Sequence, residues 1–578
     1  MLARHRLAIC GGVLMVAGFS LIRIWMARVI GNTIDGLGTP TQDAINLLAI
    51  NTGMLCGLVV AEASCRYFGR RWIIDASRHI EARLKNQLME HMSRLPVAWY
   101  DRAQTGDLLS RLTQDVELLR FLIGPSILYG TQILVTIPVG IYVMGQISST
   151  VTFAILGAFG ALLLAMLVLM PRLQKYSKRV QEDIADISQH AQESFSGIRV
   201  LLNFASSRVF CGRIDALNNR YVADNMAMTR FRASVHLVIH FCTDLVMLSV
   251  LVFGLTEVIE GRMSRGNLIE FITIMGYLVW PLIAAGWILG VIHRARAAAE
   301  RVDEVFDELP EPDGGEQVEL VGAIEVRNLT FTYPGESRPA LSGIDFQLAA
   351  GQKLGLVGEV GCGKSTLLHL LLRLYDPPRG TIFVDGHDIL DLDLRCLRRL
   401  FAFAPQDPFL FSDTVADNIR FGNATSGQSE TDSIAEAVRS AALEQDLAAF
   451  TDGLETVIGE RGVTLSGGQK QRVSLARALA AERPAVILDD TLSAVDHQTE
   501  SRILERLHGT EQDKTILVAS HRLSALAGAD LILVLKNGEV IEQGHHRDLC
   551  RGSGPFAQAW ALQLEARALG GEGGSLDG

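Results

Sequence analysis

The chain has 578 residues, of which 48% are hydrophobic and 20% charged, with a mean hydropathy of +0.24 and a formal net charge of −11. This balance is too apolar for a wholly soluble protein and too charged for a wholly membrane-embedded one, so we expect both parts. The acidic net charge argues against a nucleic-acid partner. The eight cysteines include no C-x-x-C pair, which indicates neither a zinc site nor a disulfide framework.

Six long apolar segments occupy the first half of the chain, and each is close to the length that crosses ~30 Å of hydrocarbon. The first lacks the small-residue cleavage site of a signal peptide, so we interpret it as a retained membrane helix. Together the segments predict an all-α, polytopic membrane domain over residues 1–300. The predicted spans are 7–34, 44–66, 118–145, 149–171, 233–257 and 268–292.

Charge predicts the orientation of these spans. The second-to-third and fourth-to-fifth connections are long and rich in Arg and Lys, whereas the short loops carry only Arg262 and Arg265. By the positive-inside rule, the N-terminus and both long connections are cytoplasmic. Helix-period apolar positions continue through 72–95 and 173–200, so we expect two helical arms reaching about 35–40 Å, with turns near 99–107 and 203–212. The alternative is a pair of ordinary cytoplasmic loops.

Several ionisable residues fall within the predicted spans, among them Arg23, Arg28, Glu62 and Asp244. Such groups are costly in hydrocarbon and usually face a cavity or a partner. Arg28 and Glu62 lie near the interfaces, whereas Arg23 and Asp244 are deeper. The two deeper residues are candidates for a translocation pathway, and the alternative is structural pairing inside the bundle.

Beyond the spans, the composition changes twice. Residues 301–321 are charged and rich in proline and glycine, which predicts a linker. Over 322–562, short apolar strands alternate with helices, which predicts an α/β nucleotide-binding domain. The glycine-rich tail within 563–578 is expected to be disordered.

Residues 358–366 read G-E-V-G-C-G-K-S-T, with an apolar run on each side. Strand, glycine loop and helix are in the order that a phosphate-binding loop requires. The loop's N–H groups and the helix N-terminus favour phosphate, so we expect Lys364 to reach the β- and γ-phosphates of ATP and Ser365 to ligate Mg²⁺. If the Cys362 thiol is exposed, maleimide should block ATP binding. The predicted ATP-binding residues of this loop are Gly358, Glu359, Val360, Gly361, Cys362, Gly363, Lys364, Ser365 and Thr366.

Three further residues suit nucleotide chemistry. Tyr333, in F-T-Y-P, is expected to stack on the base. The run A-V-I-L-D-D at 485–490 reads as a buried strand that ends in two acids. Asp489 is placed to hold Mg²⁺ through water, and Asp490 lies where a base or water-orienting group acts.

A second anion site is predicted where L-S-G-G-Q opens a helix. One chain does not need two such sites for one γ-phosphate, so we expect this one to act on a nucleotide held by another chain. Its residues are Leu465, Ser466, Gly467, Gly468 and Gln469.

With these motifs in place, the chain resembles ABC (ATP-binding cassette) exporter half-transporters over nearly its whole length. The matches are Tyr333 for the A-loop, 358–366 for Walker A, Gln406 for the Q-loop, 456–462 for the loop that contacts a partner's coupling helix, 465–469 for the signature, Asp489 for Walker B, Asp496 for the D-loop and His521 for the switch histidine.

The resemblance implies catalytic roles for Asp490, His521 and Gln406, nucleotide contact by Gln406, and Mg²⁺ ligation, partly through water, by Ser365, Gln406 and Asp489. It implies coupling helices at the turns of the arms and a head-to-tail dimer of nucleotide domains. It also places the protein in a bacterial cytoplasmic membrane, with the nucleotide-binding domain in the cytoplasm.

One position departs from the family pattern. Competent sites usually carry Glu after Walker B, whereas this chain has Asp490, whose carboxylate reaches about 1.5 Å less far. Mispositioning of ~1 Å can reduce a rate on the order of 10²-fold. We therefore expect this site to bind ATP and hydrolyse it slowly, in a heterodimer whose other subunit supplies a Glu. The L-D-D and span-six sequences resemble bacterial multidrug-resistance-like (Mdl-type) half-transporters, which pair in this way.

The resulting prediction is an ATPase that exports a hydrophobic or amphipathic small molecule, or a lipid, by alternating access. The alternatives are a homodimeric exporter with a working Asp490, an exporter-fold importer of the siderophore type, and a membrane ATPase that regulates a partner without transport.

Overall fold

The computed structural model describes residues 2–37, 42–423, 430–459, 462, 465–491, 499–500, 502–503 and 514–571. The chain divides into two compact units, one built from Met1–Glu90 and Gly106–Asp307 and the other from His91–Thr105 and Glu308–Gly578. The tip of the first arm therefore belongs with the α/β unit, although it lies between two membrane helices in sequence.

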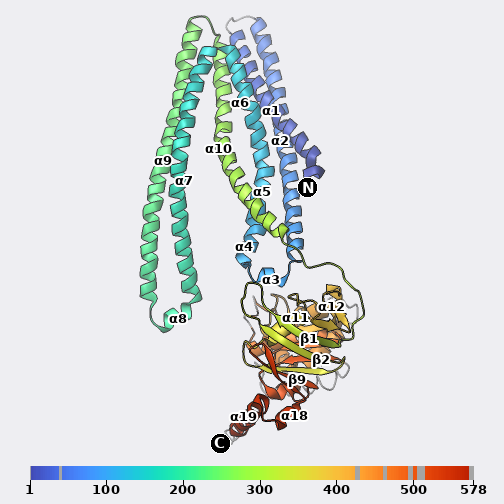
Figure 1. The fold of residues 1–578 in the computed structure, drawn as a ribbon. Coiled ribbons are helices and arrows are strands. Elements are labelled where there is room, and N and C mark those ends of the chain that lie inside the picture. Colours follow the sequence, from blue (N-terminus) through green and yellow to red (C-terminus); the bar gives the residue numbers. More distant parts are fainter. Residues whose placement is uncertain are drawn as a thin grey trace. The chain divides into compact units, whose positions relative to one another are not determined.

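The first unit is entirely helical in its described residues, and six of its helices are long and apolar enough to cross a membrane (Figure 1). Three of them have 51, 48 and 53 residues, which correspond to roughly 70–80 Å of helix, more than twice the hydrocarbon thickness. The arms are thus continuations of membrane helices. The main helices are α1 (Leu2–Gly36), α2 (Gln42–Met92), α5 (Val116–Ile123), α6 (Pro125–Ile147), α7 (Ser149–Ser196), α9 (Ser207–Ile259) and α10 (Arg265–Asp307).

The predicted third span is divided at Gly124, between α5 and α6. Its backbone leaves the helical region, with φ −92° and ψ −87°, and Pro125 begins the next helix. A Cβ at Gly124 would lie 2.7 Å from the Ser77 hydroxyl oxygen of α2, so glycine permits a close helix approach here.

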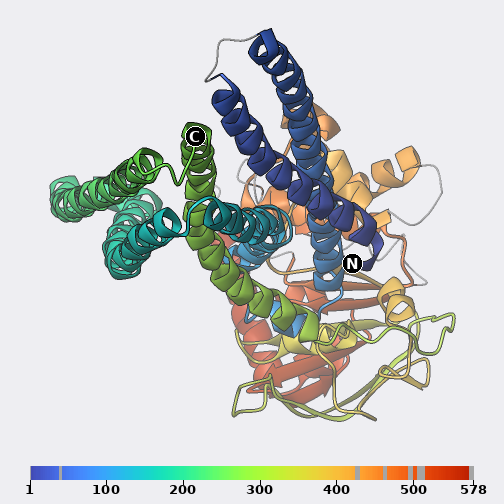
Figure 2. The ribbon, with the colours of Figure 1, turned by 90° about the horizontal axis from the view of Figure 1, so that it is seen from above.

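The second arm turns through α8 (Ile198–Asn203), earlier than the predicted turn at 203–212. Its two helices, α7 and α9, pack along each other and stand as a pair beside the other helices of their unit (Figure 2, teal and green). Arg220 Nε lies 2.7 Å from the carboxylate of Asp183, which is buried, so an ion pair joins the two helices.

The ionisable residues named in the spans have different surroundings, and Arg28 lies near the buried Glu270 of α10. The Arg23 guanidinium lies 4.1 Å from the ring centroid of Tyr277 on α10, which supports structural pairing in the bundle. Glu62 lies 3.6 Å from Arg66 on its own helix, whereas Arg28 and Asp244 are exposed on this chain.

The second unit contains two sheets. The antiparallel sheet has the order β2-β1-β4-β5, and the larger sheet has the order β10-β9-β3-β8-β7-β6, with only β10 antiparallel. The strands are β1 (Ile324–Phe331), β2 (Leu341–Leu348), β3 (Lys353–Gly358), β4 (Ile382–Val384), β5 (His387–Asp388), β6 (Phe401–Ala404), β7 (Ala485–Asp489), β8 (Thr515–Ala519), β9 (Leu531–Lys536) and β10 (Glu539–Gly544).

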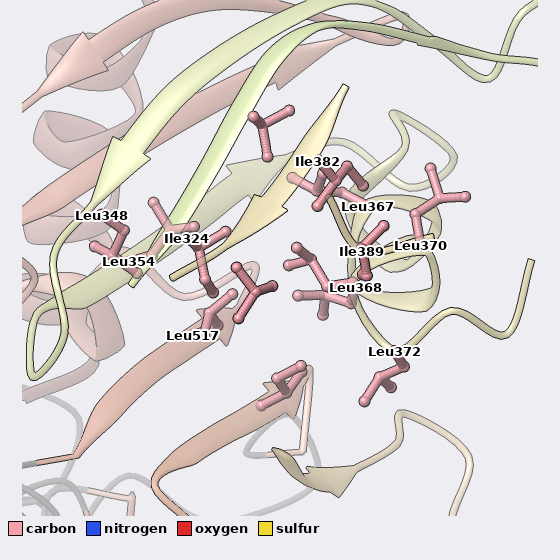
Figure 3. Close-up of a cluster of buried hydrophobic side chains, with 14 of the residues drawn as sticks. Ile324, Leu348, Leu354, Leu367, Leu368, Leu370, Leu372, Ile382, Ile389 and Leu517 are labelled. Carbon is pink, nitrogen blue, oxygen red and sulfur yellow. The ribbon is translucent and has the colours of Figure 1, made fainter. Parts of the chain in front are cut away.

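Apolar side chains fill the space between these sheets and α11 (Lys364–Leu371) (Figure 3). Leu354 of β3, Leu517 of β8 and Leu368 of α11 are completely buried. Each such burial contributes about 1.5–3 kcal/mol, so this core holds the loop between β3 and α11 in place. The other helices are α3 (Val97–Tyr100), α4 (Thr105–Ser110), α12 (Leu394–Leu400), α13 (Val415–Arg420), α14 (Glu430–Ser440), α15 (Glu444–Ala449), α16 (Gly467–Ala480), α18 (His546–Arg551) and α19 (Pro555–Gly571).

Two predicted boundaries differ from the helix ends. Helix α10 continues to Asp307, so the first residues of the predicted 301–321 linker are helical. Helix α19 reaches Gly571, well into the predicted 563–578 tail, and the remaining tail residues lie outside the described part of the chain.

Candidate functional site

The predicted nucleotide residues follow four neighbouring parallel strands. In the larger sheet, β3, β8, β7 and β6 are adjacent, with Asp489 paired to Ala519 and Ala404 to Leu488. Ligands of parallel sheets bind at the carboxyl ends of the strands. The glycine loop, His521, the two acids and Gln406 therefore leave the sheet at one edge.

The loop at 358–366 requires glycine at particular positions. Gly361 and Gly363 have φ of +82° and +107°, which glycine adopts without strain. A Cβ would lie 2.2 Å from the Leu535 carbonyl oxygen at Gly358 and 2.6 Å from Leu341 Cδ2 at Gly363. These glycines let the backbone close around a phosphate at the N-terminus of α11.

Lys364 folds back over the same loop. Its Nζ donates to the carbonyl oxygens of Gly358, at 2.8 Å, and Glu359, at 3.0 Å, and the side chain is buried. The ammonium is thus held against the inner side of the loop, where it can reach a phosphate.

The structure does not support the expected reaction of the Cys362 thiol with maleimide. Its side chain is only 4% exposed, and its Sγ lies 3.6 Å from Lys364 Nζ. Maleimide reacts with an accessible thiolate, so a block of ATP binding through an exposed Cys362 is not expected from this geometry.

Ser365 and Asp489 meet at the end of β7. The Asp489 carboxylate is buried, and the Ser365 side chain lies near enough to favour its ionised form. Burial raises the pKa of Asp489, while Ser365, His369 and Lys364 oppose that rise. A hydroxyl and a carboxylate are oxygen ligands of the kind that Mg²⁺ takes together with substrate phosphates, so these residues fit the ion.

Asp490 is held by the backbone of the neighbouring strand. Its N–H donates to the Ala519 carbonyl oxygen at 2.9 Å, and its φ is +45°, in the left-handed region that Asp tolerates better than most residues. The side chain is buried. Gln406 and His521, by contrast, are exposed at the same edge of the sheet, after β6 and β8.

Tyr333 lies beside the start of α11. Its hydroxyl donates to Thr366 Oγ1 at 3.1 Å, and its ring meets the ring of Tyr375 edge-on, with centroids 5.0 Å apart. The ring orientation of Tyr333 is therefore fixed on two sides.

Tyr375 and Asp101 were missed by the sequence reasoning. The Tyr375 hydroxyl donates to the carboxylate of Asp101, which follows α3 in the tip of the first arm. Burial and the nearby Asp101 raise the pKa of Tyr375. No motif or spacing predicts this pair, because Tyr375 and Asp101 are 274 positions apart in sequence.

The L-S-G-G-Q segment begins α16 with a capping box. Ser466 N donates to Gln469 Oε1 at 2.9 Å, and Gln469 N donates to Ser466 Oγ at 3.3 Å. Ser466 and Gly467 are exposed, so this helix N-terminus faces outward from its own unit. The predicted Asp496, and Glu460 and Arg461 of the 456–462 loop, lie outside the described residues.

Comparison with known proteins extends over both units. Residues 7–282 match the family model described as the ABC transporter transmembrane region, and residues 341–493 match the one described as ABC transporter. The chain is 33% identical over 572 residues to the multidrug resistance-like ATP-binding protein MdlA of Escherichia coli K12, covering 97% of this chain and 95% of that protein. It is 32% identical over 574 residues to an ATP-dependent lipid A-core flippase of Idiomarina loihiensis, covering 98% and 97%.

A solved structure of a bacterial Atm1-family ABC exporter with ATP bound matches with a TM-score of 0.79 at 23% identity, covering 97% of this chain and 98% of that one. At this identity the likeness describes the fold.

Proposed function

The chain belongs to the ABC transporter family, as an ATP-driven exporter with its transmembrane region and ATP-binding domain in one polypeptide, and we propose that it forms one half of a heterodimer with a slow ATP site at Asp490. It is a multi-pass protein of the bacterial inner membrane with a cytoplasmic ATP-binding domain. The dimeric partner, the cargo and the division of labour between sites are our proposals.

The proposed cargo is a lipid or a hydrophobic or amphipathic small molecule. The two relatives compared above are named for lipid A-core flipping and for multidrug resistance, and each aligns along nearly the whole chain. Both names concern molecules that enter a membrane, which supports this class without selecting one compound.

At the nucleotide site, the loop glycines and Lys364 would hold the phosphates of ATP, and Tyr333 would stack on the base. Ser365 and Asp489, with Gln406, would hold Mg²⁺, whose charge offsets that of the phosphates. Asp490 would orient the attacking water, and His521 would contact the terminal phosphate from β8. The observation that supports this assignment most directly is the buried Asp489 carboxylate beside Ser365 and Lys364.

A slow site is supported by the length of Asp490. Its backbone is fixed by the hydrogen bond to Ala519, so the short carboxylate cannot be advanced by a simple shift of the chain. The intact L-S-G-G-Q of this chain would complete a site on the partner that carries Glu.

Exposed aromatic residues support the dimer. Large apolar side chains surround α8 at the tip of the second arm, where Phe195 and Phe204 are 76% and 73% exposed. On the α/β unit, Phe409 and Phe421 are exposed as well. Large apolar side chains that gather outside the membrane commonly mark an interface, and we propose that the arm tip docks on the partner's α/β unit.

ATPase activity tests the proposal. The chain purified alone should hydrolyse ATP slowly, Asp490→Glu should raise the rate several-fold, and co-expression with a half-transporter that carries Glu should give substrate-stimulated turnover. Rapid turnover by the unmodified chain, unchanged by Asp490→Glu, would contradict the heterodimer and favour a homodimer. Uptake instead of export in oriented vesicles would contradict the direction, and turnover indifferent to every hydrophobic compound tested would contradict transport.

A further inference from the structure

Asp446 on α15 contacts the first turns of α16 through two side chains. Its Oδ2 accepts from Arg472 Nε at 2.7 Å, and its Oδ1 accepts from Arg472 Nη2 at 2.9 Å and from Gln469 Nε2 at 3.2 Å. Asp446 and Arg472 are each only 14% exposed. A two-pronged arginine–carboxylate pair fixes orientation as well as position, so α15 and α16 are held in one register here.

Gln469 transmits this constraint to the signature segment, residues 465–469. An ionised carboxylate only accepts hydrogen bonds, so Asp446 requires the NH₂ end of the Gln469 amide to face it. The oxygen end must then face the opposite way, where Ser466 N donates to it at 2.9 Å. The charge on Asp446 therefore selects one of the two orientations of this amide.

The selected orientation leaves the signature segment ready for an anion. Ser466 Oγ accepts from Gln469 N, so the hydroxyl proton remains available to donate. Among the described residues, a Cβ at Gly467 would meet no heavy atom within 4 Å, so space for a ligand lies directly over the helix N-terminus.

We propose that Asp446 is a positioning residue for phosphate binding by the signature segment. It acts through Gln469 and touches no substrate itself. The inference rests on the proposed function, in which the signature segment contacts the terminal phosphate of a nucleotide held by a second subunit.

Two substitutions separate positioning from packing. Asp446→Asn keeps the size of the side chain but adds a donor, so either amide orientation of Gln469 becomes possible. Asp446→Glu keeps an acceptor-only carboxylate but alters the size. If Asp446 positions the signature, Asn should lower kcat of the assembled transporter about tenfold while Glu stays within about threefold of wild type. ATP affinity at this chain's own phosphate loop should change less than about twofold in both.

Glu436→Gln on α14 is the matched control, because it also neutralises one acid in an ion pair. Glu436 lies 2.9 Å from Arg439, and both side chains are more than half exposed. This variant should keep wild-type kcat. Thermal unfolding of every variant should be followed alongside the kinetics.

Each outcome supports or overturns either the inference or the proposed function. Full activity of Asp446→Asn, with Ser466→Arg inactive, would overturn the inference and leave the proposed function intact. Full activity of Ser466→Arg as well would overturn the proposed action of the signature across the dimer. If Asp446→Asn unfolds, Asp446→Glu decides alone: activity within about threefold supports positioning, and a folded variant with about a tenfold loss refutes it.

Discussion

Tyr375 donates a hydrogen bond to Asp101, and its ring lies edge-on against Tyr333. The residue expected to stack on the base is thus two contacts from the tip of the first arm, inside one compact unit. Under the proposed function, this arrangement would link an occupied base site to the arm tip, residues 91–105, within the same unit.

Removing the Tyr375 hydroxyl should weaken that route without changing the ring contacts. In Tyr375→Phe, we expect ATP affinity to stay unchanged and substrate-stimulated ATPase activity to fall several-fold, because the tip loses a hydrogen bond worth about 1 kcal/mol between the half-buried Tyr375 and the exposed Asp101. Asp376→Asn, which alters the neighbouring pair with Arg373, is the control. Substrate stimulation equal to that of wild type would show that the Tyr375–Asp101 hydrogen bond does not contribute to it.

The same pair predicts a flat pH response. Burial and Asp101 raise the pKa of Tyr375 above its ordinary value, so its hydroxyl remains protonated and able to donate through the whole range in which the transporter is assayed. The ratio of wild-type to Tyr375→Phe stimulation should therefore not fall between about pH 7 and 9. A ratio that drops with rising pH would mean that the hydroxyl ionises there.

Thiol labelling should discriminate between two cysteines. Cys362 is buried beside Lys364, whereas Cys211 on α9 is exposed. Without nucleotide, maleimide should modify Cys211 rapidly and Cys362 much more slowly, as measured by mass spectrometry of peptides over time. Equal rates would indicate that the phosphate loop opens widely in solution.

Asp489→Asn should raise the stability of the ligand-free protein and reduce its stabilisation by Mg²⁺. Burial raises the pKa of Asp489, so ionisation of this carboxyl is less favourable in the folded than in the unfolded protein. The ligand-free variant should therefore unfold at a higher temperature than wild type at neutral pH, and lose this advantage as pH falls to the ordinary carboxyl range.

Mg²⁺ and ATP together should raise the unfolding temperature of wild type, and EDTA should remove this increase. Asp489→Asn should show no such increase, with or without EDTA. Asp452→Asn, at an exposed position, should behave as wild type in both tests. A Mg²⁺-dependent shift that survives in Asp489→Asn would remove Asp489 from the metal site.

The fold class was accessible from sequence because its signals are local. The apolar lengths of the spans, the helical period of the arms and the strand–loop–helix order around Gly358 each depend on neighbouring residues. The buried strand that ends at Asp489 was also predictable, because its run of apolar residues is local.

Contacts between distant segments were not accessible in the same way. Nothing local assigns residues 91–105 to the α/β unit, pairs Tyr375 with Asp101, or places Asp446 under the signature segment. The division of the third span at Gly124 depends on how closely Ser77 of another helix approaches. The periodicity of one segment gives no information on that distance.

The left-handed backbone at Asp490 affects which substitutions this position accepts during evolution. A codon for Asp becomes one for Glu through one base change, but Glu would enter this conformation at a penalty of roughly 1–2 kcal/mol that Asp largely escapes. A single mutation would still restore the longer carboxylate, at this small cost in stability. Subunit specialisation at this position would thus remain reversible.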